Sequence, residues 1–474
     1  MKVLLVNPPS VNIYGVLGNR YPPLGLAYLA ASLRERGYEV GILDLDVDQR
    51  TSLDLGGFDV VGITSDTPRY ERALEIAKEA KGRGCIVVMG GYHVTFRDEG
   101  ALSSGYVDYV VRGEGEETFP ALLDVLSGKG CPKEVGGISF EENGRFLRTP
   151  DAPPPQDLDS LPMPARDLLP MSKYHTLLQG RPATSLITSR GCPFNCYFCA
   201  SSTFGGLRWR PRSPKSIVDE IEHLYREYGY RAFAFMDDNF TLSPRRVVAF
   251  IEELDRRGLD ISWYCFSRVD TIVRNPELVT RMAEAGAVEV FLGLESGSQE
   301  ALDSYGKRIT VEQEREAIAI LRCCGIKAYG SFIIGGIRET REMTEQTIRL
   351  ARELDPWAVQ FSILTPYPGT GLFEQARREN RIVTYLWRYY DGLHAVLRGD
   401  FLSPHEVQEL LVRAYNEFFL RGRRLLWMIR RGLRRPWLAM FLVREGLTAL
   451  RLGRMLREYR RKLERSCGGN PLAQ

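Results

Sequence analysis

The sequence predicts an α/β protein with two strand-and-helix domains followed by a helical segment. Its 474 residues are too many for one ordinary hydrophobic core, and its 44% hydrophobic and 26% charged content is typical of soluble globular proteins. Short apolar runs alternate with helical segments over most of the chain, which is the pattern of parallel sheets. We expect a doubly wound, Rossmann-like domain over 1–148, a proline-rich linker over 149–182, a partial barrel over 183–390 and a basic helical region over 391–474.

Strands and helices alternate in the first third of the chain. Strands are expected within 2–9, 39–46, 59–66, 85–93 and 107–115, and helices within 23–39 and 69–84. Each strand ends in proline, glycine, aspartate or serine, so polar loops gather at the carboxyl edge, where doubly wound sheets bind ligands. A hairpin that turns at Asn143-Gly144 follows. The proline content of 150–170 then predicts a linker without helix or central strand.

Six strand–helix units are predicted after residue 183. The strands fall within 185–192, 231–240, 261–270, 287–297, 326–336 and 358–369, each followed by a helical segment. A full TIM barrel needs eight such units. We therefore expect an open, TIM-type (β/α)6 barrel, with helices alone after about residue 390.

Overall charge and cysteine usage narrow the class of protein. The net charge of +3 provides no strong field for a nucleic-acid partner. The N-terminal stretch "MKVLLVNPPS" has neither an apolar signal core nor a small-residue cleavage site. Most of the nine cysteines are scattered singly, as in proteins of a reducing compartment. We expect a cytoplasmic protein that acts on a small molecule.

Three cysteines lie within eight positions of the stretch "SRGCPFNCYFCASS". Cys192, Cys196 and Cys199 have the spacing C-x3-C-x2-C at the end of the first barrel strand, so one loop could bring them to a single metal centre. Structural zinc requires a fourth ligand, and the nearest histidine in sequence, His175, precedes the strand. Iron–sulfur clusters normally take four cysteines, so three would leave one iron open to an outside ligand. Zinc stays as the alternative.

The triplet, the aromatic Phe198 before its last cysteine and its place at the start of a (β/α)6 pattern resemble the radical S-adenosylmethionine (SAM) superfamily over about residues 183–370. The resemblance implies a [4Fe–4S] cluster on Cys192, Cys196 and Cys199, with SAM chelating the fourth iron. One electron would cleave SAM into methionine and a 5′-deoxyadenosyl radical. An open iron predicts oxygen sensitivity and anaerobic chemistry. The absence of a further cysteine cluster predicts an external ferredoxin or flavodoxin as electron donor.

The same resemblance suggests further SAM contacts at the ends of the barrel strands. Asp237 and Asp238 would approach the amino group, although a helix N-cap is the alternative. Arg268 would pair with the methionine carboxylate, and Glu295 would bind the ribose hydroxyls or the amine. Gly335, in "GSFIIGG", would let the backbone approach the adenine, with ordinary packing as the alternative.

The first domain resembles the cobalamin-binding (B12-binding) module of one radical SAM class. The resemblance assigns Thr64 and Ser65 after the third strand, and Gly90 and Gly91 after the fourth, to the cobalamin nucleotide tail. A plain nucleotide-type fold with ordinary caps and turns is the alternative.

Two stretches of this domain, one after its first strand and one after its fifth, bear on how it would bind cobalamin. The D-x-H-x-x-G motif, which supplies a lower cobalt ligand in other modules, is replaced here by "NPPSVNIYG". We therefore expect no histidine below the cobalt, with His93, after the fourth strand, as a loop residue or a residue on the nucleotide side. Glu116 and Glu117, in "RGEGEETF", either complement a helix N-terminus or border the cobalamin face.

The C-terminal region interleaves arginine with large apolar residues over 419–465. Basic amphipathic helices lie on anionic bilayers, which would place the protein at the inner face of the membrane. A helical cap packed on the barrel is the alternative. The longest apolar run, "PWLAMFLV", is far shorter than the roughly 20 residues of a membrane span.

Together these features predict a cobalamin-dependent radical SAM enzyme that modifies an unactivated carbon. C-methylation of a hydrophobic substrate, such as a lipid or tetrapyrrole, is the leading interpretation. Oxidative cyclisation is the enzymatic alternative, because the anaerobic magnesium-protoporphyrin monomethyl ester cyclase has a similar two-domain organisation. A cobalamin or redox sensor is the non-enzymatic alternative.

Overall fold

The structure is a computed structural model that describes residues 1–9, 20–48, 55–422 and 459. The chain forms two compact units. The first contains Met1–Thr176, Thr184–Phe194 and Ala200–His223, and the second contains Leu177–Ala183, Asn195–Cys199 and the described residues from Leu224 onward. Most of the predicted basic segment 419–465 lies outside the described residues.

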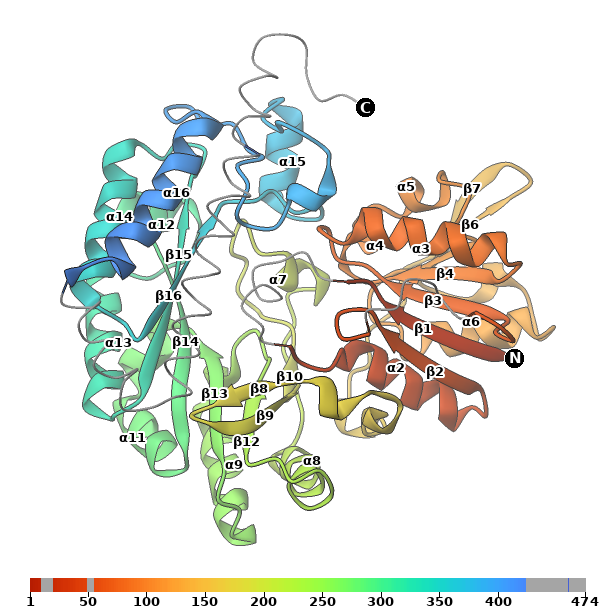
Figure 1. Cartoon of the computed structure of the whole chain (residues 1–474), viewed down its shortest axis with the longest axis horizontal. Coiled ribbons are helices and arrows are strands. Elements are labelled where there is room, and N and C mark those ends of the chain that lie inside the picture. Colours follow the sequence, from red (N-terminus) through yellow and green to blue (C-terminus); the bar gives the residue numbers. More distant parts are fainter. Residues whose placement is uncertain (10–19, 49–54, 423–458, 460–474) are drawn as a thin grey trace. The chain divides into compact units, whose positions relative to one another are not determined.

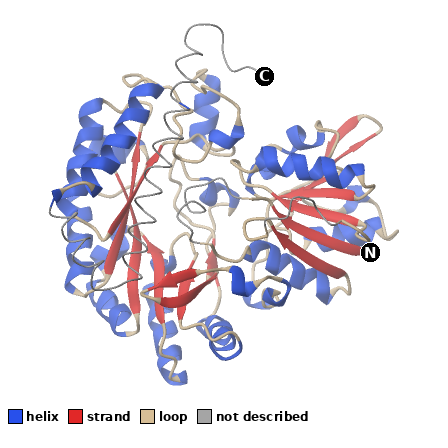
Figure 2. Cartoon of the chain, viewed as in Figure 1, coloured by secondary structure: helices blue, strands red, loops and turns tan. Residues whose placement is uncertain are grey.

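A seven-stranded sheet forms the centre of the first unit (Figures 1 and 2). Its strands are β1 (Lys2–Asn7), β2 (Glu39–Asp44), β3 (Val60–Thr64), β4 (Ile86–Gly90), β5 (Tyr109–Val111), β6 (Ile138–Glu142) and β7 (Arg145–Arg148). They are ordered β2-β1-β3-β4-β5-β6-β7, and β1 to β5 pair in parallel. The predicted doubly wound sheet is therefore confirmed, and its chain order reverses direction between β1 and β3.

Helices cover this sheet because each has one apolar face. They are α2 (Leu24–Glu35), α3 (Tyr70–Gly82), α4 (Tyr92–Phe96), α5 (Asp98–Leu102) and α6 (Thr118–Leu126). Leu26 and Leu33 of α2 and Phe119 of α6 pack with Val3 and Val60 of the sheet in one buried cluster. Burial of these apolar side chains is the main stabilising contribution to this unit.

The predicted hairpin is formed by β6 and β7, which pair antiparallel with Glu142 opposite Arg145. Asn143 and Gly144 have φ angles of 54° and 72°. Positive φ at both central residues is the requirement of a type I′ turn, which Asn-Gly satisfies. This local expectation is confirmed.

The proline-rich stretch 150–170 contains neither an α-helix nor a strand, as expected, but it is packed into the first unit. Short 3-10 turns cover Leu158–Ser160, Arg166–Leu168 and, just beyond it, Met171–Lys173; another at Pro132–Glu134 precedes β6. Arg166 is buried and its Nη2 lies 2.7 Å from Oε1 of the buried Glu220. Such a desolvated pair requires that both partners stay in place.

A second seven-stranded sheet has the order β16-β15-β14-β13-β12-β9-β8. Its strands are β8 (Thr176–Leu178), β9 (Arg181–Leu186), β12 (Ala232–Phe235), β13 (Ser262–Ser267), β14 (Ala287–Glu295), β15 (Lys327–Ile334) and β16 (Ala358–Ile363). Strands β12 to β16 are parallel. The six long strands and their helices confirm the partial (β/α)6 barrel.

The helices of this part follow the strands in sequence (Figure 1). They are α7 (Ala200–Phe204), α8 (Pro214–Glu227), α9 (Pro244–Arg257), α10 (Val269–Arg274), α11 (Pro276–Glu284), α12 (Gln299–Ser304), α13 (Val311–Cys323), α14 (Arg341–Leu354), α15 (Gly371–Arg378) and α16 (Pro404–Phe419). Short 3-10 turns cover Phe240–Leu242 and Trp387–Tyr389. Helix α16 represents the expected C-terminal helical segment, and its capping box joins Ser403 to Glu406.

The two faces of the barrel sheet have different surroundings. Trp263 of β13 is fully buried and lies 6.0 Å, ring to ring, from Phe250 of α9, so this face packs against the helices. Side chains alternate along a strand, and Tyr264 and Phe266 therefore point to the opposite, inner face. Among the described helices, none has the length and hydropathy needed to cross a bilayer.

Candidate active site

The predicted cysteine loop is closed at its base by a short antiparallel ribbon. Strand β10 (Ser189–Arg190) pairs with β11 (Arg210–Pro211), so residues 191–209 form the connecting loop. Gly191, directly before Cys192, has φ of 79°, and a Cβ there would lie 2.1 Å from the carbonyl oxygen of Arg208. Only glycine fits this close backbone approach.

All three predicted cluster cysteines lie on this loop, and none of them forms a disulfide. Cys192 is buried, whereas Cys196 and Cys199 are partly buried and share a tight turn in which the Cys199 amide donates to the Cys196 carbonyl at 3.0 Å. Over the described ranges, no group of three His, Cys, Asp or Glu side chains has the geometry of a metal site. By their chemistry, three soft thiol donors on one short loop fit an iron–sulfur cluster.

The thiol of Cys196 is surrounded by charged groups of the barrel. Burial raises its pKa, while the positive charges of Lys307 and Arg268 act in the opposite direction. Nearby cations stabilise a thiolate, which is the form that binds metal. The structure therefore brings Cys196 together with the predicted SAM residue Arg268 and with Lys307, which sequence reasoning missed.

Backbone hydrogen bonds hold the centre of the cysteine loop. The Tyr197 amide donates to the Tyr305 carbonyl at 3.1 Å, and the Leu372 amide donates to the Tyr197 carbonyl at 3.2 Å. The ring of Phe198 meets Tyr305 edge to face, with 5.7 Å between centroids. Phe198 thus helps to fix the loop, and its contact with a cofactor stays a prediction.

Glu295 ends β14 in an unusual backbone conformation and forms a buried ion pair. Its φ is 72°, and its Oε1 lies 2.5 Å from Nζ of Lys307. A Cβ at Gly293 would come within 2.5 Å of that oxygen and 2.6 Å of that nitrogen, so the pair needs glycine beneath it. Non-glycine residues with positive φ cost free energy and concentrate at functional sites. Lys307 gave no signal in the sequence because it stands alone in a loop.

Arg268, directly after β13, is linked through Lys307 to Glu295 at the end of β14. Its Nε donates to Oδ1 of Asp270 at 2.9 Å, and its Nη2 donates to the Lys307 carbonyl at 2.8 Å. All three residues are buried. Arg268 is therefore held beside the Glu295–Lys307 pair.

The alternative role of Asp237 and Asp238 as helix caps is wrong. The N-cap of α9 is Ser243, whose side chain accepts from the Arg246 amide. Asp237 is instead buried, with Oδ2 at 3.6 Å from Nη2 of Arg246, whereas Asp238 is exposed. Serine was the better candidate for the cap because Ser-Pro places proline at the first helical position.

Two further buried carboxyl groups in the second unit escaped the sequence analysis. Glu339 accepts hydrogen bonds from the Gly336 amide and the Thr344 hydroxyl, both at 2.7 Å, yet burial raises its pKa. Glu314 is fully buried, and neither of its oxygens has a hydrogen-bond partner among the described residues. Burial, and next the negative charge of Glu295, raise the pKa of Glu314 well above its usual value. Neither Glu314, in α13, nor Glu339, in the loop before α14, has a local sequence signal for burial.

Gly335 is required by packing. Its φ is 82°, and a Cβ there would lie 2.6 Å from Cγ1 of Val407 in α16. This observation supports the packing alternative, and an adenine contact stays a prediction.

In the first unit, the predicted cobalamin residues lie together at the ends of β3 and β4. The Ser65 amide donates to the Gly90 carbonyl at 2.8 Å. Gly91 has φ of 104°, and a Cβ there would lie 2.7 Å from the Ser65 carbonyl oxygen and 3.1 Å from Oγ1 of Thr64. This close approach, at the carboxyl edge of a doubly wound sheet, fits a site for a long ligand tail.

His93 lies inside α4 and is buried, so the loop alternative is wrong, and a place on the nucleotide side stays a prediction. Its Nδ1 is 3.3 Å from the Thr67 hydroxyl, and its ring centroid is 4.2 Å from that of Tyr70. Burial, together with the positive charge of Arg97, lowers the pKa of His93 to about 3. The ring is therefore neutral at physiological pH.

Of the two acidic residues directly before α6, Glu116 forms an ion pair with Arg190, Oε1 to Nη2, at 2.8 Å, and its roles at the helix N-terminus or the cobalamin face stay predictions. Glu117 is the N-cap of α6 but makes no side-chain capping bond. Arg190 follows Glu116 by 74 residues, so no local pattern could have predicted this pair.

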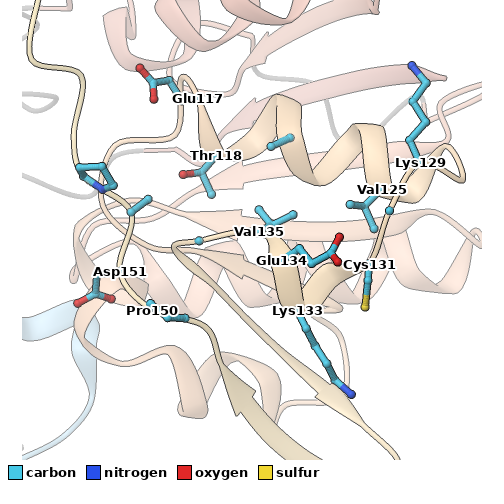
Figure 3. Close-up of a pocket in the computed structure, with 15 residues that line it drawn as sticks. Glu117, Thr118, Val125, Lys129, Cys131, Lys133, Glu134, Val135, Pro150 and Asp151 are labelled. Atoms are coloured by element: carbon cyan, nitrogen blue, oxygen red, sulfur yellow. The ribbon is translucent and has the colours of Figure 1, made fainter.

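A separate cavity of about 540 Å³ lies beside α6, between Val125, Val135 and Pro150 (Figure 3). The side chains of Lys129 and Lys133 extend in opposite directions at its border (Figure 3). Glu117 lines this cavity, whereas Thr64, Ser65, Gly90 and Gly91 do not.

Comparison with known proteins identifies the class. A model described as the B12 binding domain matches residues 12–123, and a model described as the Radical SAM superfamily matches residues 186–351. The chain therefore belongs to the cobalamin-binding class of the radical SAM superfamily. It is a radical SAM enzyme, and its cofactors are a [4Fe–4S] cluster, S-adenosylmethionine and cobalamin. The zinc and sensor alternatives are accordingly set aside.

The chain is similar to two curated proteins over nearly its whole length. It is 42% identical to an uncharacterized methyltransferase of Pyrococcus horikoshii, over 90% of this chain and 94% of that relative. It is 31% identical to the anaerobic magnesium-protoporphyrin IX monomethyl ester cyclase of Rubrivivax gelatinosus, over 89% of this chain and 78% of that relative.

Among solved structures, the cobalamin-dependent S-adenosylmethionine radical enzyme OxsB with aqua-cobalamin bound shares the fold. Its TM-score is 0.72 at 19% identity, and the match covers 95% of this chain and 72% of OxsB.

Proposed function

We propose that this enzyme methylates an unactivated carbon of a hydrophobic small molecule. The observation that carries the proposal is the presence, in one chain, of a cobalamin domain and a C-x3-C-x2-C loop beside buried barrel charges. A relative named as a methyltransferase supports methyl transfer. When bound, the cluster supplies the electron that cleaves SAM, and cobalamin carries the methyl group.

In this proposal Cys192, Cys196 and Cys199 hold the cluster. Burial raises the pKa of the Cys196 thiol, and the positive charges of Lys307 and Arg268 offset part of that effect. The contacts of Tyr197 with Tyr305 keep the loop ordered.

The charged groups at the ends of the barrel strands bind SAM. Arg268 pairs with the methionine carboxylate, and Glu295 and Asp237 provide negative charge for the amino group. Lys307 pairs with Glu295 in this buried position. Asp238, Phe198 and Gly335 stay candidates for weaker contacts with SAM.

Thr64, Ser65, Gly90 and Gly91 bind the cobalamin nucleotide tail. Because Gly91 has no Cβ, it can lie directly against the Ser65 backbone at the end of β3. A side chain there would collide with Ser65 and displace the turn that carries the proposed tail contacts.

Aromatic side chains on the inner face of the barrel support a hydrophobic substrate. Phe291 of β14 lies 4.8 Å from Phe266 of β13 and 5.0 Å from Tyr329 of β15, ring centroid to ring centroid. Tyr264 continues the row at 6.1 Å from Phe266. Such rings bury large apolar surfaces and bind the flat or apolar parts of ligands.

A lipid or a tetrapyrrole has the apolar surface that this row of rings would bind. Oxidative cyclisation is the second candidate reaction, because a cyclase is among the similar proteins. We further propose that the enzyme acts in the cytoplasm with a ferredoxin or flavodoxin as electron donor. Contact of the basic C-terminal region with a membrane concerns residues outside the described ranges and stays a prediction.

The test is an anaerobic turnover of the reconstituted enzyme with cobalamin, a low-potential reductant, a lipid extract of the native cells and SAM with a deuterated methyl group. Mass spectrometry would follow S-adenosylhomocysteine, 5′-deoxyadenosine and labelled product. We expect deuterium in an extracted lipid, with both SAM products in equal amounts. Formation of 5′-deoxyadenosine with an unlabelled, dehydrogenated or cyclised product would favour cyclisation.

A further inference from the structure

We infer that Glu114 and Glu116 of the cobalamin domain are positioning residues for the cluster loop, because they neutralise the two arginines that close its base. This inference rests on the proposed function, in which Cys192, Cys196 and Cys199 hold the cluster. It assigns a purpose to the "RGEGEE" segment between β5 and α6.

The ribbon at the base of the loop has two like charges facing each other. Arg190 of β10 lies directly opposite Arg210 of β11 in the antiparallel register. Directly opposed residues lie on the same face of a ribbon, and like charges there are destabilising. A two-stranded ribbon has little stability of its own, so this repulsion must be compensated by other groups.

Glu114 and Glu116 supply that compensation. Oε2 of Glu114 lies 2.7 Å from Nη1 of Arg190 and 3.1 Å from Nη1 of Arg210, so one carboxylate bridges both arginines. Its other oxygen accepts from Nη2 of Arg210, which makes that pair bidentate. Glu116 binds Nη2 of Arg190 at 2.8 Å. Two negative charges thus balance two positive charges.

This network is withdrawn from solvent. The side chains of Arg190, Arg210, Glu114 and Glu116 are 14%, 5%, 8% and 7% exposed. Burial alone would raise the pKa of Glu114, but its bonds to the arginines outweigh it and leave the pKa below the usual value. Exposed ion pairs contribute little to stability, whereas breaking a buried pair leaves an uncompensated charge.

The network acts on the loop at its first residue. Arg190 is followed by Gly191 and Cys192, and its guanidinium lies 5.1 Å from the ring centroid of Tyr28 in α2. Arg210 also donates from Nη1 to the Pro155 carbonyl at 2.6 Å. Displacing either arginine would therefore move the start of the loop that carries the proposed cluster ligands.

The experiment compares Glu114→Gln and Glu116→Gln with Glu141→Gln in the full-length, reconstituted enzyme. Glu141 is a matched control because it is an exposed glutamate of the same unit, in β6. Each variant is first assayed for cobalamin binding and iron content. The readouts are the rate of 5′-deoxyadenosine formation per cluster and the midpoint potential and electron paramagnetic resonance spectrum of the reduced cluster.

We expect Glu114→Gln and Glu116→Gln to bind cobalamin normally but to cleave SAM roughly 10- to 100-fold more slowly, the usual range for residues that orient metal ligands. The midpoint potential should shift to less negative values, because removal of a carboxylate favours the reduced, more negative cluster. A merely structural role would lower stability without moving the potential or the spectrum.

The inference is overturned if both variants match Glu141→Gln in rate, potential and spectrum at full iron content. Should the glutamine variants fail to fold, Arg190→Lys replaces them, since it keeps the charge and loses the two-carboxylate geometry. Unchanged cleavage and potential in Arg190→Lys would equally overturn it. A Cys192→Ala enzyme that retains its cluster would instead refute the proposed function itself, so the two failures are distinguishable.

Discussion

The buried histidine of the cobalamin domain predicts a specific loss of stability in acid. His93 has a pKa of about 3 in the folded chain, against 6.5 as its ordinary value. Between these values the unfolded chain binds a proton that the folded chain does not, so acid favours unfolding. The contribution of the neutral His93 ring to the free energy of unfolding is complete above pH 6.5 and is lost progressively as the pH falls toward 3.

The magnitude follows from the two pKa values. At pH 4.5 the unfolded histidine is almost fully protonated and the folded one is neutral. The free energy of unfolding should therefore be about 2.5 kcal/mol lower at pH 4.5 than at pH 7 on account of this group. His93→Phe removes the titration and retains a ring against Tyr70, at the cost of the contact with Thr67, about 1 kcal/mol.

The assay is urea unfolding of the full chain at pH 7.0 and 4.5, with hydrogen exchange of β3 and β4 peptides to identify the transition of the first unit. Wild type should lose about 2.5 kcal/mol more than His93→Phe on acidification, because the titrations of distant carboxyl groups cancel in the comparison. The exposed His223→Asn variant serves as the control and should behave as wild type. An equal loss in wild type and His93→Phe would show that the ring does not stay neutral in the folded chain.

Three further predictions concern the cofactor sites. Cys196→Ala should abolish both the iron–sulfur absorbance and 5′-deoxyadenosine formation, while exposed Cys323→Ala keeps them; a retained cluster in Cys196→Ala would refute its role. Gly91→Ala should cost about 1–3 kcal/mol of backbone strain and weaken cobalamin binding, measured by an absorbance titration. Gly82→Ala is the control, because a Cβ at Gly82 would meet open space. Equal cobalamin affinities of the two variants would count against the assigned site. Lys307→Met should lower the free energy of urea unfolding by about 3–5 kcal/mol, because Glu295 is left as an unpaired buried charge; a loss below about 1 kcal/mol would show that the pair is not desolvated.

The features that the sequence determined alone depend on residues close together along the chain. Alternating apolar segments specified the two parallel sheets, and Asn143-Gly144 specified the hairpin because its turn requires only those two conformations. The cysteine triplet was recognisable for the same reason, since three thiols within eight positions need no tertiary contact to be noticed.

Tertiary structure decided which charges are paired and which polar groups are buried. Arg190 meets Glu114 across 76 residues, and Lys307 meets Glu295 only because the loop after α12 returns to the end of β14. The burial of His93 inside α4 was not predicted, because a histidine has no local signature of burial. Strand register and the path of the chain set the distances between these groups. The loss of contact with water sets the strength of their ion pairs. None of these depends only on residues that are neighbours in sequence.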